Sequence, residues 1–302
     1  MDKDNLKRIF GYSLYAKYRK RRQGRVLLKE IEKRIADDTL LKDLNEDELR
    51  DWNLRIATVL SSPDNRKIQC VDDAGTLKDG LLVMHNGIVI EPLSYYGYPI
   101  LKMLLHNRGI HEPQEEYVFQ EVLKEIPRGG TMVELGAYWS FYSMWFNRVI
   151  PDAKNYMIEP CNIGYGMANF KYNRLKGNFF QYYIGDAPSA NEDGSRTISV
   201  DSFIRENGIG FVDILHSDIQ GYELLMLHGA QELLAKRKVG YVFISTHSDD
   251  LHADCARIMD RMGFIRLCAA DLQQTFSQDG LLVYKNPEYK GIEKIEISLR
   301  EN

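Results

Sequence analysis

The chain has 302 residues, enough for one large domain or for a catalytic domain preceded by a smaller one. Hydrophobic residues make up 44% and charged residues 27%, as in ordinary globular proteins, and the net charge of −4 argues against general nucleic-acid binding. We expect no transmembrane segment and no signal peptide, because no apolar run suits either. The four scattered cysteines favour reduced thiols in a cytoplasmic protein.

Residues 1–110 are predicted to form an accessory region of helices and a β-hairpin. Nine Lys or Arg and two Asp lie in residues 1–25, most densely from Lys17 to Arg25, and seven acids follow in residues 37–51. Such charge is typical of a solvated helical face. The alternative is a basic patch for an anionic glycan, a lipid surface or a partner chain. The helices at this end also predict self-association into a homo-oligomer.

Local patterns place the first elements. Apolar residues at helical spacing over residues 27–35 predict a helix. Asn45 and Glu48 form a capping-box pattern that begins a second helix, and Ser61-Ser-Pro-Asp-Asn ends it. Short strands are expected on both sides of a hairpin turn at His85-Asn86-Gly87.

From residue 111 onward strands and helices alternate, beginning with a helix near Pro113. Strands are predicted at residues 131–136, 154–159, 178–184, 211–217, 239–246, 263–269 and 280–285, and helices at 140–149, 162–175, 201–207, 221–236 and 250–262. This α/β alternation predicts a doubly wound, mostly parallel sheet over residues 111–302. The last two strands have no helix between them, so we expect an antiparallel edge strand.

The turn after the first strand of this region is a candidate cofactor site. Gly136 lacks a Cβ and allows the backbone to approach a ligand closely, and Ser140 is placed to cap the following helix. Bulky Tyr138 and Trp139 replace a glycine-rich loop, which disfavours NAD but suits S-adenosylmethionine, a cofactor without phosphate. A tight turn without ligand is the alternative. The expected cofactor contacts here are Glu134, Gly136, Ala137, Tyr138 and Ser140.

Two acids follow later strands. Glu159 lies 23 residues after Gly136, a spacing that suits a carboxylate binding ribose hydroxyls. It would otherwise cap the next helix. Asp186 follows the third strand and is expected on the adenine side of the cofactor, with a simple turn aspartate as the alternative.

The fourth and fifth strands end in polar residues, which predict the reaction site. His216 and Asp218 point the same way because side chains alternate along a strand, and Gln220 follows them. If these strands are neighbours, His247 lies beside Asp218. A hydroxyl needs a base before it attacks carbon, and His247 or His216 is the candidate.

Other roles for these residues stay open. Asp218 would orient the histidine or hold the substrate hydroxyl, or Asp218, His216 and His247 would bind a divalent metal that lowers the pKa of the hydroxyl. Histidines satisfied by hydrogen bonds at strand ends are the structural alternative. The polar segment from His111 to Glu116 is either a lid or an acidic helix start. Tyr138, Trp139, Tyr142 and Trp145 are candidates to wall the pocket and stack on a sugar ring. The helical spacing of Tyr142 and Trp145 is more typical of a core.

Together these segments resemble the FkbM-type methyltransferase family over residues 112–285. The segments that carry the resemblance are Val133–Ala137, Met157–Pro160, Val200–Phe203, Asp218–Leu224 and Thr246-His247. The resemblance implies a class I methyltransferase-like fold, S-adenosylmethionine as donor, and cofactor contacts from Glu134, Gly136 and Glu159. It also implies methylation of hydroxyls, often on sugars.

The chain departs from the family pattern in the fourth-strand motif. Where the family commonly has a lysine and Asp-Val-Glu-Gly, this chain has His216 and Asp218-Ile-Gln220-Gly. The identity of the base or metal ligand is therefore open. The leading hypothesis is an O-methyltransferase acting on a glycan or small-molecule acceptor. A nicotinamide-dependent oxidoreductase and a non-catalytic binding or assembly module are the alternatives.

Overall fold

The computed structural model describes residues 24–301. The chain divides into two compact units between Arg50 and Asp51, and the domain boundary expected near residue 110 stays a prediction. In the first unit residues 24–36 are helical, which confirms the first expected helix. Nearly all of the basic segment from Lys17 to Arg25 lies outside the described residues, so the roles predicted for it stay predictions.

Helix α2 (Glu46–Ser61) begins with the expected capping box. The backbone N–H of Glu48 donates to Asn45 Oδ1 at 2.9 Å, and the backbone N–H of Asn45 donates to Glu48 Oε2 at 3.0 Å. The helix ends at Ser61, as predicted, because the next residues form the short 3-10 helix η1 (Pro63–Arg66).

Three short antiparallel strands follow: β1 (Leu77–Lys78), β2 (Leu81–Val83) and β3 (Val89–Ile90). Gly87 has a φ of +77°, a conformation that glycine adopts without steric cost in a hairpin turn. The predicted hairpin is therefore confirmed. Helix α3 (Gly97–His106) comes next.

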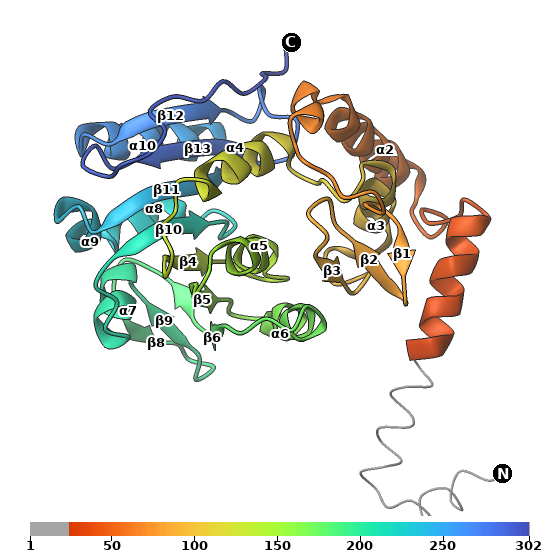
Figure 1. The fold of residues 1–302 in the computed structure, drawn as a ribbon, viewed down its shortest axis with the longest axis horizontal. Helices are drawn as coiled ribbons and strands as arrows, with labels where there is room; N and C mark the ends of the chain where they lie inside the picture. The colour runs from red at the N-terminus through yellow and green to blue at the C-terminus, as the bar shows by residue number, and fades with distance from the viewer. Residues whose placement is uncertain (1–23, 302) are drawn as a thin grey trace, which may run out of the picture. The chain divides into compact units, whose positions relative to one another are not determined.

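A seven-stranded sheet forms the centre of the second unit (Figure 1). Its strands are β4 (Thr131–Leu135), β5 (Lys154–Ile158), β6 (Asn178–Phe180), β10 (Val212–Ser217), β11 (Val239–Thr246), β12 (Ile265–Ala270) and β13 (Gly280–Lys285). The order is β12-β13-β11-β10-β4-β5-β6, and β13 runs antiparallel to both of its neighbours. The doubly wound, mostly parallel sheet with an antiparallel pair at one edge is confirmed.

Helices cover both faces of this sheet. Figure 1 shows α4, α5 and α6 on one side and α7 to α10 on the other. The first group is α4 (Pro113–Leu123), α5 (Phe141–Val149) and α6 (Ile163–Tyr172). The second group is α7 (Val200–Glu206), α8 (Glu223–His228), α9 (Gln231–Ala235) and α10 (Asp249–Arg261).

Side-chain alternation along β4 shows how the sheet separates core from site. Val133 and Leu135 are fully buried in the core under α7 to α10. Glu134, between them, points to the opposite face, where its Oε2 accepts a hydrogen bond from the backbone N–H of Ser143 at 3.2 Å. The strand therefore presents an acid to the α4–α5 side of the sheet.

Two predicted elements are wrong in their extent. The strand expected at residues 178–184 is divided between β6 and β7 (Tyr183–Ile184), because β7 pairs with β9 (Arg196–Ile198) in a small sheet that also holds β8 (Ser189–Ala190). The helix expected at residues 221–236 is divided into α8 and α9 near Gly229.

The division at Gly229 has a physical cause. A Cβ at this position would collide with the backbone oxygen of Gly185. Asp201 of α7 also accepts hydrogen bonds from the backbone N–H groups of Glu232 and Leu233, at 2.8 and 2.9 Å, and so caps a new helix. Asp201 belongs to Val200–Phe203, one of the segments that carry the family resemblance, and it therefore acts in this structure as a helix cap.

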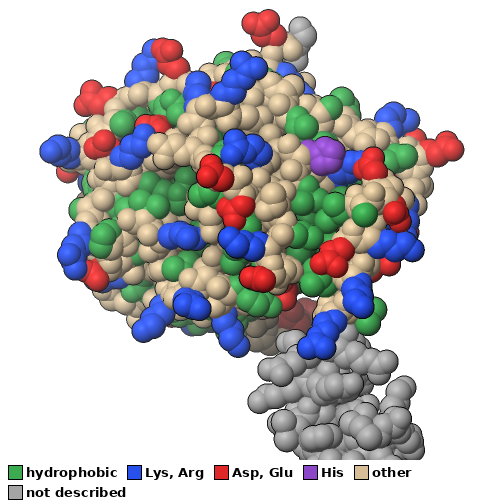
Figure 2. Space-filling view, turned by 45° about the vertical axis from the view of Figure 1, so that its right-hand side comes forward, with side chains coloured by type: hydrophobic (Ala, Val, Ile, Leu, Met, Phe, Trp, Pro, Cys, Tyr) green, Lys and Arg blue, Asp and Glu red, His purple; other side chains and the backbone are tan. Residues whose placement is uncertain are grey.

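Acidic and basic side chains are interspersed on the face of the described part shown in Figure 2. This distribution fits the small net charge of −4. Among residues 24–301 no helix is both long and apolar enough to cross a membrane.

Candidate functional site

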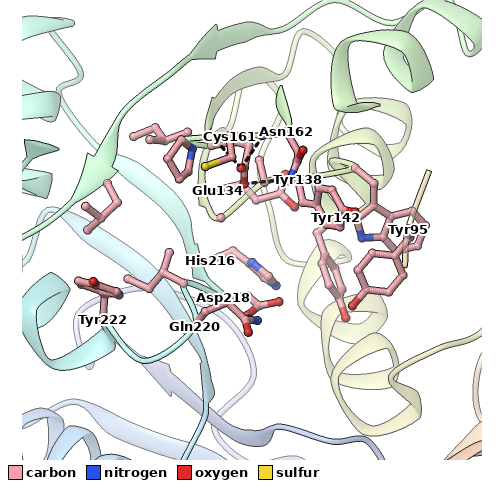
Figure 3. A pocket seen from close by; sticks show the side chains of 18 of the residues that line it. Tyr95, Glu134, Tyr138, Tyr142, Cys161, Asn162, His216, Asp218, Gln220 and Tyr222 are labelled. Carbon is pink, nitrogen blue, oxygen red and sulfur yellow. Dashed lines mark hydrogen bonds between the residues drawn. The ribbon is translucent and has the colours of Figure 1, made fainter. Parts of the chain in front are cut away.

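A cavity of about 340 Å³ lies at the carboxyl ends of β4, β5 and β10 (Figure 3). The chain passes from β4 to β5 on one side and later returns to β10 on the other side of β4. These ends therefore mark the switch in strand order where ligands bind in open α/β sheets. The volume is typical of a small-molecule site.

Most predicted site residues line this cavity: Glu134, Gly136, Ala137, Tyr138, Glu159, His216, Asp218 and Gln220. Ser140, Asp186 and His247 are not part of the lining. Ser140 is buried behind the turn, Asp186 is exposed after β7, and His247 contacts Asp218 from outside the lining. Trp139 and Tyr142 line the cavity, whereas Trp145 does not.

The turn after β4 needs glycine for a reason that the sequence did not reveal. Gly136 has a φ of +76°, and a Cβ there would collide with the backbone carbonyl oxygen of Asp218. The close approach that glycine allows is therefore, first of all, that of the β10 end. This contact places Asp218 next to the turn.

Ser140 does not cap α5 with its side chain, contrary to the prediction. It occupies the N-cap position, but its φ is +61° and its side chain makes no capping hydrogen bond. Capping serines adopt an extended backbone instead, which directs the hydroxyl to the first turn of the helix. Here the Ser140 side chain packs beside Gly166 of α6, where any Cβ would collide with its Oγ.

Glu159 at the end of β5 binds three backbone N–H groups. Its Oε1 accepts from Cys161 and Asn162 at 2.8 and 2.9 Å, and its Oε2 accepts from Tyr138 at 3.3 Å. Glu159 thus bonds the turn that leads into α6, whereas the capping role considered for it is absent, because the N–H groups it binds precede the helix. A carboxylate has about four lone-pair sites, so Oε2 still has capacity for a hydroxyl donor in the cavity.

Glu134 is a buried acid in the cavity wall. Burial raises its pKa to about 7, although the charge of His216 opposes this. The carboxyl is held toward α5 by its hydrogen bond from Ser143. Its protonation therefore changes near neutral pH.

His216 is held by a carboxylate from another element. Its Nε2 lies 2.6 Å from Oε1 of Glu115 on α4, and its ring lies 4.3 Å from that of Tyr142. Burial opposes a charged imidazole, but the Glu115 carboxylate outweighs burial and raises the pKa of His216. Nδ1 has no hydrogen-bond partner among residues 24–301. Figure 3 shows His216 and Asp218 side by side, facing Tyr142 and Tyr95.

His247 lies among three carboxylates, and the predicted neighbourhood with Asp218 is confirmed. Its Nε2 is 3.2 Å from Asp218 and 3.6 Å from Asp279, and its Nδ1 is 3.0 Å from Glu223. These contacts are ion pairs, since neither nitrogen has the alignment of a hydrogen bond. Burial lowers the pKa of His247, but the three acids outweigh it and raise the pKa to about 10. A ring charged at neutral pH favours a positioning role over that of a base.

The pKa of Asp279, which lies beside His247 in the connection before β13, is also raised. Burial and the charge of Asp218 raise its pKa to about 7, with His247 opposing. The carboxyl of Asp279 therefore changes charge near neutral pH, next to a ring that remains charged.

The segment that begins α4 is a wall of the cavity. His111 Nδ1 lies 2.6 Å from Glu116 and its Nε2 lies 3.0 Å from Glu112, which also accepts from the Tyr142 hydroxyl at 2.9 Å. Burial opposes the charge on His111, but both acids outweigh it and raise its pKa to about 10. Glu116 also accepts the backbone N–H groups of His111 and Glu112. These ion pairs fix the helix start beside the cavity.

The predicted metal ligands are not brought together as one group. His216 pairs with Glu115, whereas both ring nitrogens of His247 face carboxylates. Within residues 24–301 no group of three or more His, Cys, Asp or Glu side chains has an arrangement suited to a metal ion.

Three features escaped the sequence reasoning. Glu115 was predicted only as part of a polar segment, because an acid in the first turn of a helix indicates nothing about a histidine 101 residues away. Asp279 precedes a glycine and resembles an ordinary turn residue. Tyr95 and Tyr96 also line the cavity, and the run Tyr95-Tyr-Gly-Tyr was an available signal.

A family model described as the methyltransferase FkbM domain matches residues 82–266. No curated protein matches the chain. Among solved structures, the chain is similar to the precorrin-6Y C5,15-methyltransferase of Geobacter metallireducens GS-15, with 10% identity and a TM-score of 0.39 over 56% of this chain and 87% of that one. It is also similar to M. capricolum TrmK in complex with S-adenosyl-homocysteine, with 10% identity and a TM-score of 0.38 over 57% and 69% of the two chains. A SAM-dependent methyltransferase from Aquifex aeolicus has 16% identity and a TM-score of 0.35 over 55% and 88%.

The family match spans more than half of the chain. It begins within β2, upstream of residues 112–285, and it contains the strand ends that form the cavity. The chain therefore belongs to the FkbM family of S-adenosylmethionine-dependent methyltransferases.

Proposed function

We propose that the protein transfers a methyl group from S-adenosylmethionine to a hydroxyl of a sugar, a glycan or a related small molecule. The imidazole of His216 is the observation that carries this proposal. It lines the cavity, Glu115 holds its Nε2 at 2.6 Å, and its Nδ1 is a buried atom without a hydrogen-bond partner within the described chain. A histidine oriented by a carboxylate is suited to accept a proton from a weakly acidic hydroxyl.

The charges of the cavity suit the donor. Four acids line it, Glu112, Glu134, Glu159 and Asp218, and none of its lining residues in the described chain is Lys or Arg. The His111 ring, which also lines it, is held between Glu112 and Glu116. S-adenosylmethionine carries a positive sulfonium and a positive amino group, which an acidic wall attracts. When bound, the donor supplies an electrophilic methyl carbon.

Particular residues fit the rest of the donor. Oε2 of Glu159 has capacity for a ribose hydroxyl beside its bond from the Tyr138 N–H. Ile158, Tyr182 and Ile184 give one side of the cavity an apolar surface suited to a flat purine. Asp186, outside the lining, is less suited to this side than the sequence suggested.

His216 then performs the proton transfer. Nδ1 is buried in the cavity wall, so the acceptor hydroxyl must enter between the neighbouring side chains to reach it. Nδ1 then takes the hydroxyl proton as the acceptor oxygen is methylated, and Glu115 stabilises the imidazolium that forms. The raised pKa of His216 makes it a stronger base above that pKa. The burial of both side chains, 4% and 6% exposed, keeps water from competing for this pair.

Asp218 and its neighbours position the acceptor. Gln220 donates to Oδ1 of Asp218 at 3.2 Å, and His247 lies 3.2 Å from the same oxygen. Both contacts use Oδ1, so Oδ2 is available to accept from a ligand. We assign His247 the role of holding Asp218 through charge.

His216→Asn tests the assignment. We expect S-adenosylmethionine to raise the melting temperature of both wild type and variant, while kcat of the variant falls by about 10²- to 10⁴-fold, the usual contribution of a general base. His228→Asn, at an exposed position of α8, is the matched control and should behave as wild type.

The acceptor is found by a methyl-transfer screen over sugars, glycans and small alcohols. An unchanged kcat in His216→Asn would remove His216 as the base. A wild-type protein that binds S-adenosylmethionine but methylates only nitrogen, carbon or thiol acceptors would overturn the hydroxyl assignment.

A further inference from the structure

Five aromatic rings form a continuous path from the cavity to the surface. Trp139 and Tyr95 stack with centroids 4.5 Å apart and an interplanar angle of 13°. Tyr95 contacts Tyr96 at 4.8 Å, and Tyr96 contacts Tyr138 at 5.4 Å. Tyr138 in turn contacts Tyr165 of α6 at 5.7 Å. We call these five residues the aromatic track.

The track runs from buried to exposed positions. Trp139 and Tyr95 are 6% and 7% exposed, whereas Tyr96 and Tyr165 are 50% and 39% exposed. All except Tyr165 line the cavity. Its outer rings therefore add little to the hydrophobic core and remain available to a ligand.

The backbone of the track is strained at two of its rings. Tyr96 has a φ of +42° and Tyr138 a φ of +34°, in the left-handed region that non-glycine residues rarely occupy. Such a conformation costs about 1–3 kcal/mol, and both of these tyrosines line the cavity. Since half of Tyr96 remains exposed, burial of its ring does not explain this cost.

One buried side chain fixes the three segments that carry the track. Asn169 of α6 donates to Ser94 Oγ at 3.3 Å and to the backbone oxygen of Trp139 at 3.1 Å. Its Oδ1 accepts the backbone N–H of Glu91 at 3.0 Å. The segment before Tyr95, the turn after β4 and α6 are thus tied together, so the track is organised before a ligand arrives.

The charges near the track select against anions. The cavity wall has four acids and, within the described residues, neither Lys nor Arg; the two imidazoles in the wall, His111 and His216, are each paired with carboxylates. Burial raises the pKa values of Tyr95 and Tyr96, and the positive charge of Arg55 opposes this rise. Arg55 does not line the cavity, and its guanidinium lies over the ring of Trp52 at 4.8 Å. Single-stranded nucleic acids bind aromatic residues in a positively charged groove, which differs from this wall.

We propose that the aromatic track binds an uncharged oligosaccharide, with the methylated sugar inside the cavity and the following sugars over Tyr96, Tyr138 and Tyr165. This inference rests on the proposed hydroxyl methylation. Sugar rings present C–H faces that pack on aromatic rings, and their hydroxyls find partners in tyrosine O–H groups. The acceptor is thus longer than one sugar and carries no phosphate, sulfate or carboxylate.

The test measures kcat/KM for neutral mono-, di- and tetrasaccharides of gluco, galacto, manno and rhamno series. In wild type, we expect kcat/KM for the tetrasaccharide of the preferred series to be at least tenfold higher than kcat/KM for its monosaccharide. In Tyr165→Ala this ratio should fall toward one. Tyr172→Ala is the matched control, since Tyr172 lies on the same helix, is 43% exposed and stands outside the track; it should keep the wild-type ratio.

A second readout is independent of turnover. Tetrasaccharide binding should quench the fluorescence of wild type, in which Trp139 belongs to the track, at lower concentrations than it quenches Tyr165→Ala. A preference for a sulfated or phosphorylated tetrasaccharide, or for a single-stranded oligonucleotide, would overturn the inference.

The inference and the function it rests on fail in different ways. If sugars are methylated equally well at all lengths and Tyr165→Ala matches Tyr172→Ala, the track has no role and the proposed function stands. If no sugar is methylated while another acceptor is, the proposed function itself fails.

Discussion

Glu115→Gln gives the sharpest test of the proposed site, because Glu115 contacts His216 but does not line the cavity. The variant replaces the carboxylate 2.6 Å from His216 with a neutral amide of the same shape. His216 then loses the charge that stabilises its protonated form. The amide N–H₂ group can also donate to Nε2, which would place the ring proton on Nδ1, where the base must be free.

The size of the effect follows from the pair itself. The two side chains are 4% and 6% exposed, so solvent screens their interaction only weakly. A hydrogen bond to a charged group contributes about 1.5–3 kcal/mol. Since 1.36 kcal/mol corresponds to a tenfold change in rate, kcat should fall by about 10- to 150-fold.

The assay follows S-adenosyl-homocysteine formation across pH, with donor affinity measured by calorimetry. Glu115 raises the pKa of His216, so the acid limb of the rate profile should move to lower pH in Glu115→Gln, while the donor Kd stays unchanged. Glu121→Gln, on the same helix with its partner Lys124 at the surface, is the control. A kcat within twofold of wild type together with an unmoved acid limb would refute the assignment of Glu115.

Two further predictions concern stability. Gly136→Ala places a Cβ against the carbonyl of Asp218 in a backbone with φ of +76°. Its free energy of unfolding should fall in urea titrations by more than about 1–3 kcal/mol, the cost of the backbone conformation alone; Gly164→Ala, with open space around the new Cβ, should show no loss. Asp279→Asn removes a carboxyl whose pKa is raised from 3.8 to about 7 in the fold. Because the folded wild type holds this proton more tightly than the unfolded chain, its stability falls as the pH rises from 3.8 to about 7. The variant has no such carboxyl and keeps its stability over this range. Melting temperatures should therefore favour the variant more at pH 8 than at pH 4.5, and an equal difference at both would contradict the prediction.

The sheet was largely predictable because its signals are local. Buried strands such as Val239–Thr246 are continuous apolar runs, and the helices between them carry caps and periodic apolar residues. The failures arose where distant contacts decide the outcome. The helical sequence around Gly229 is divided where Asp201, from another helix, caps the second piece, and Gly185 packs so closely on Gly229 that no Cβ fits there.

The sequence predicted which residues lie at the candidate site better than it predicted what each of them does. Strand ends meet at one edge of a parallel sheet, so residues such as Glu134, Glu159 and Asp218 could be grouped from topology alone. The difference between the two histidines depends on partners far apart in sequence. His216 has a single carboxylate and an unpaired nitrogen, whereas His247 faces three acids.

The amide of Asn169 has a consequence for how such enzymes diversify. It joins the hairpin segment ending at Ser94 to the sheet unit through backbone groups and one hydroxyl. These contacts do not depend on the side chains of Tyr95 and Tyr96. If this wall binds the acceptor as proposed, its rings can change by substitution while the strand ends proposed to face the donor keep their residues. The two proposed halves of the site can therefore vary separately within one continuous fold.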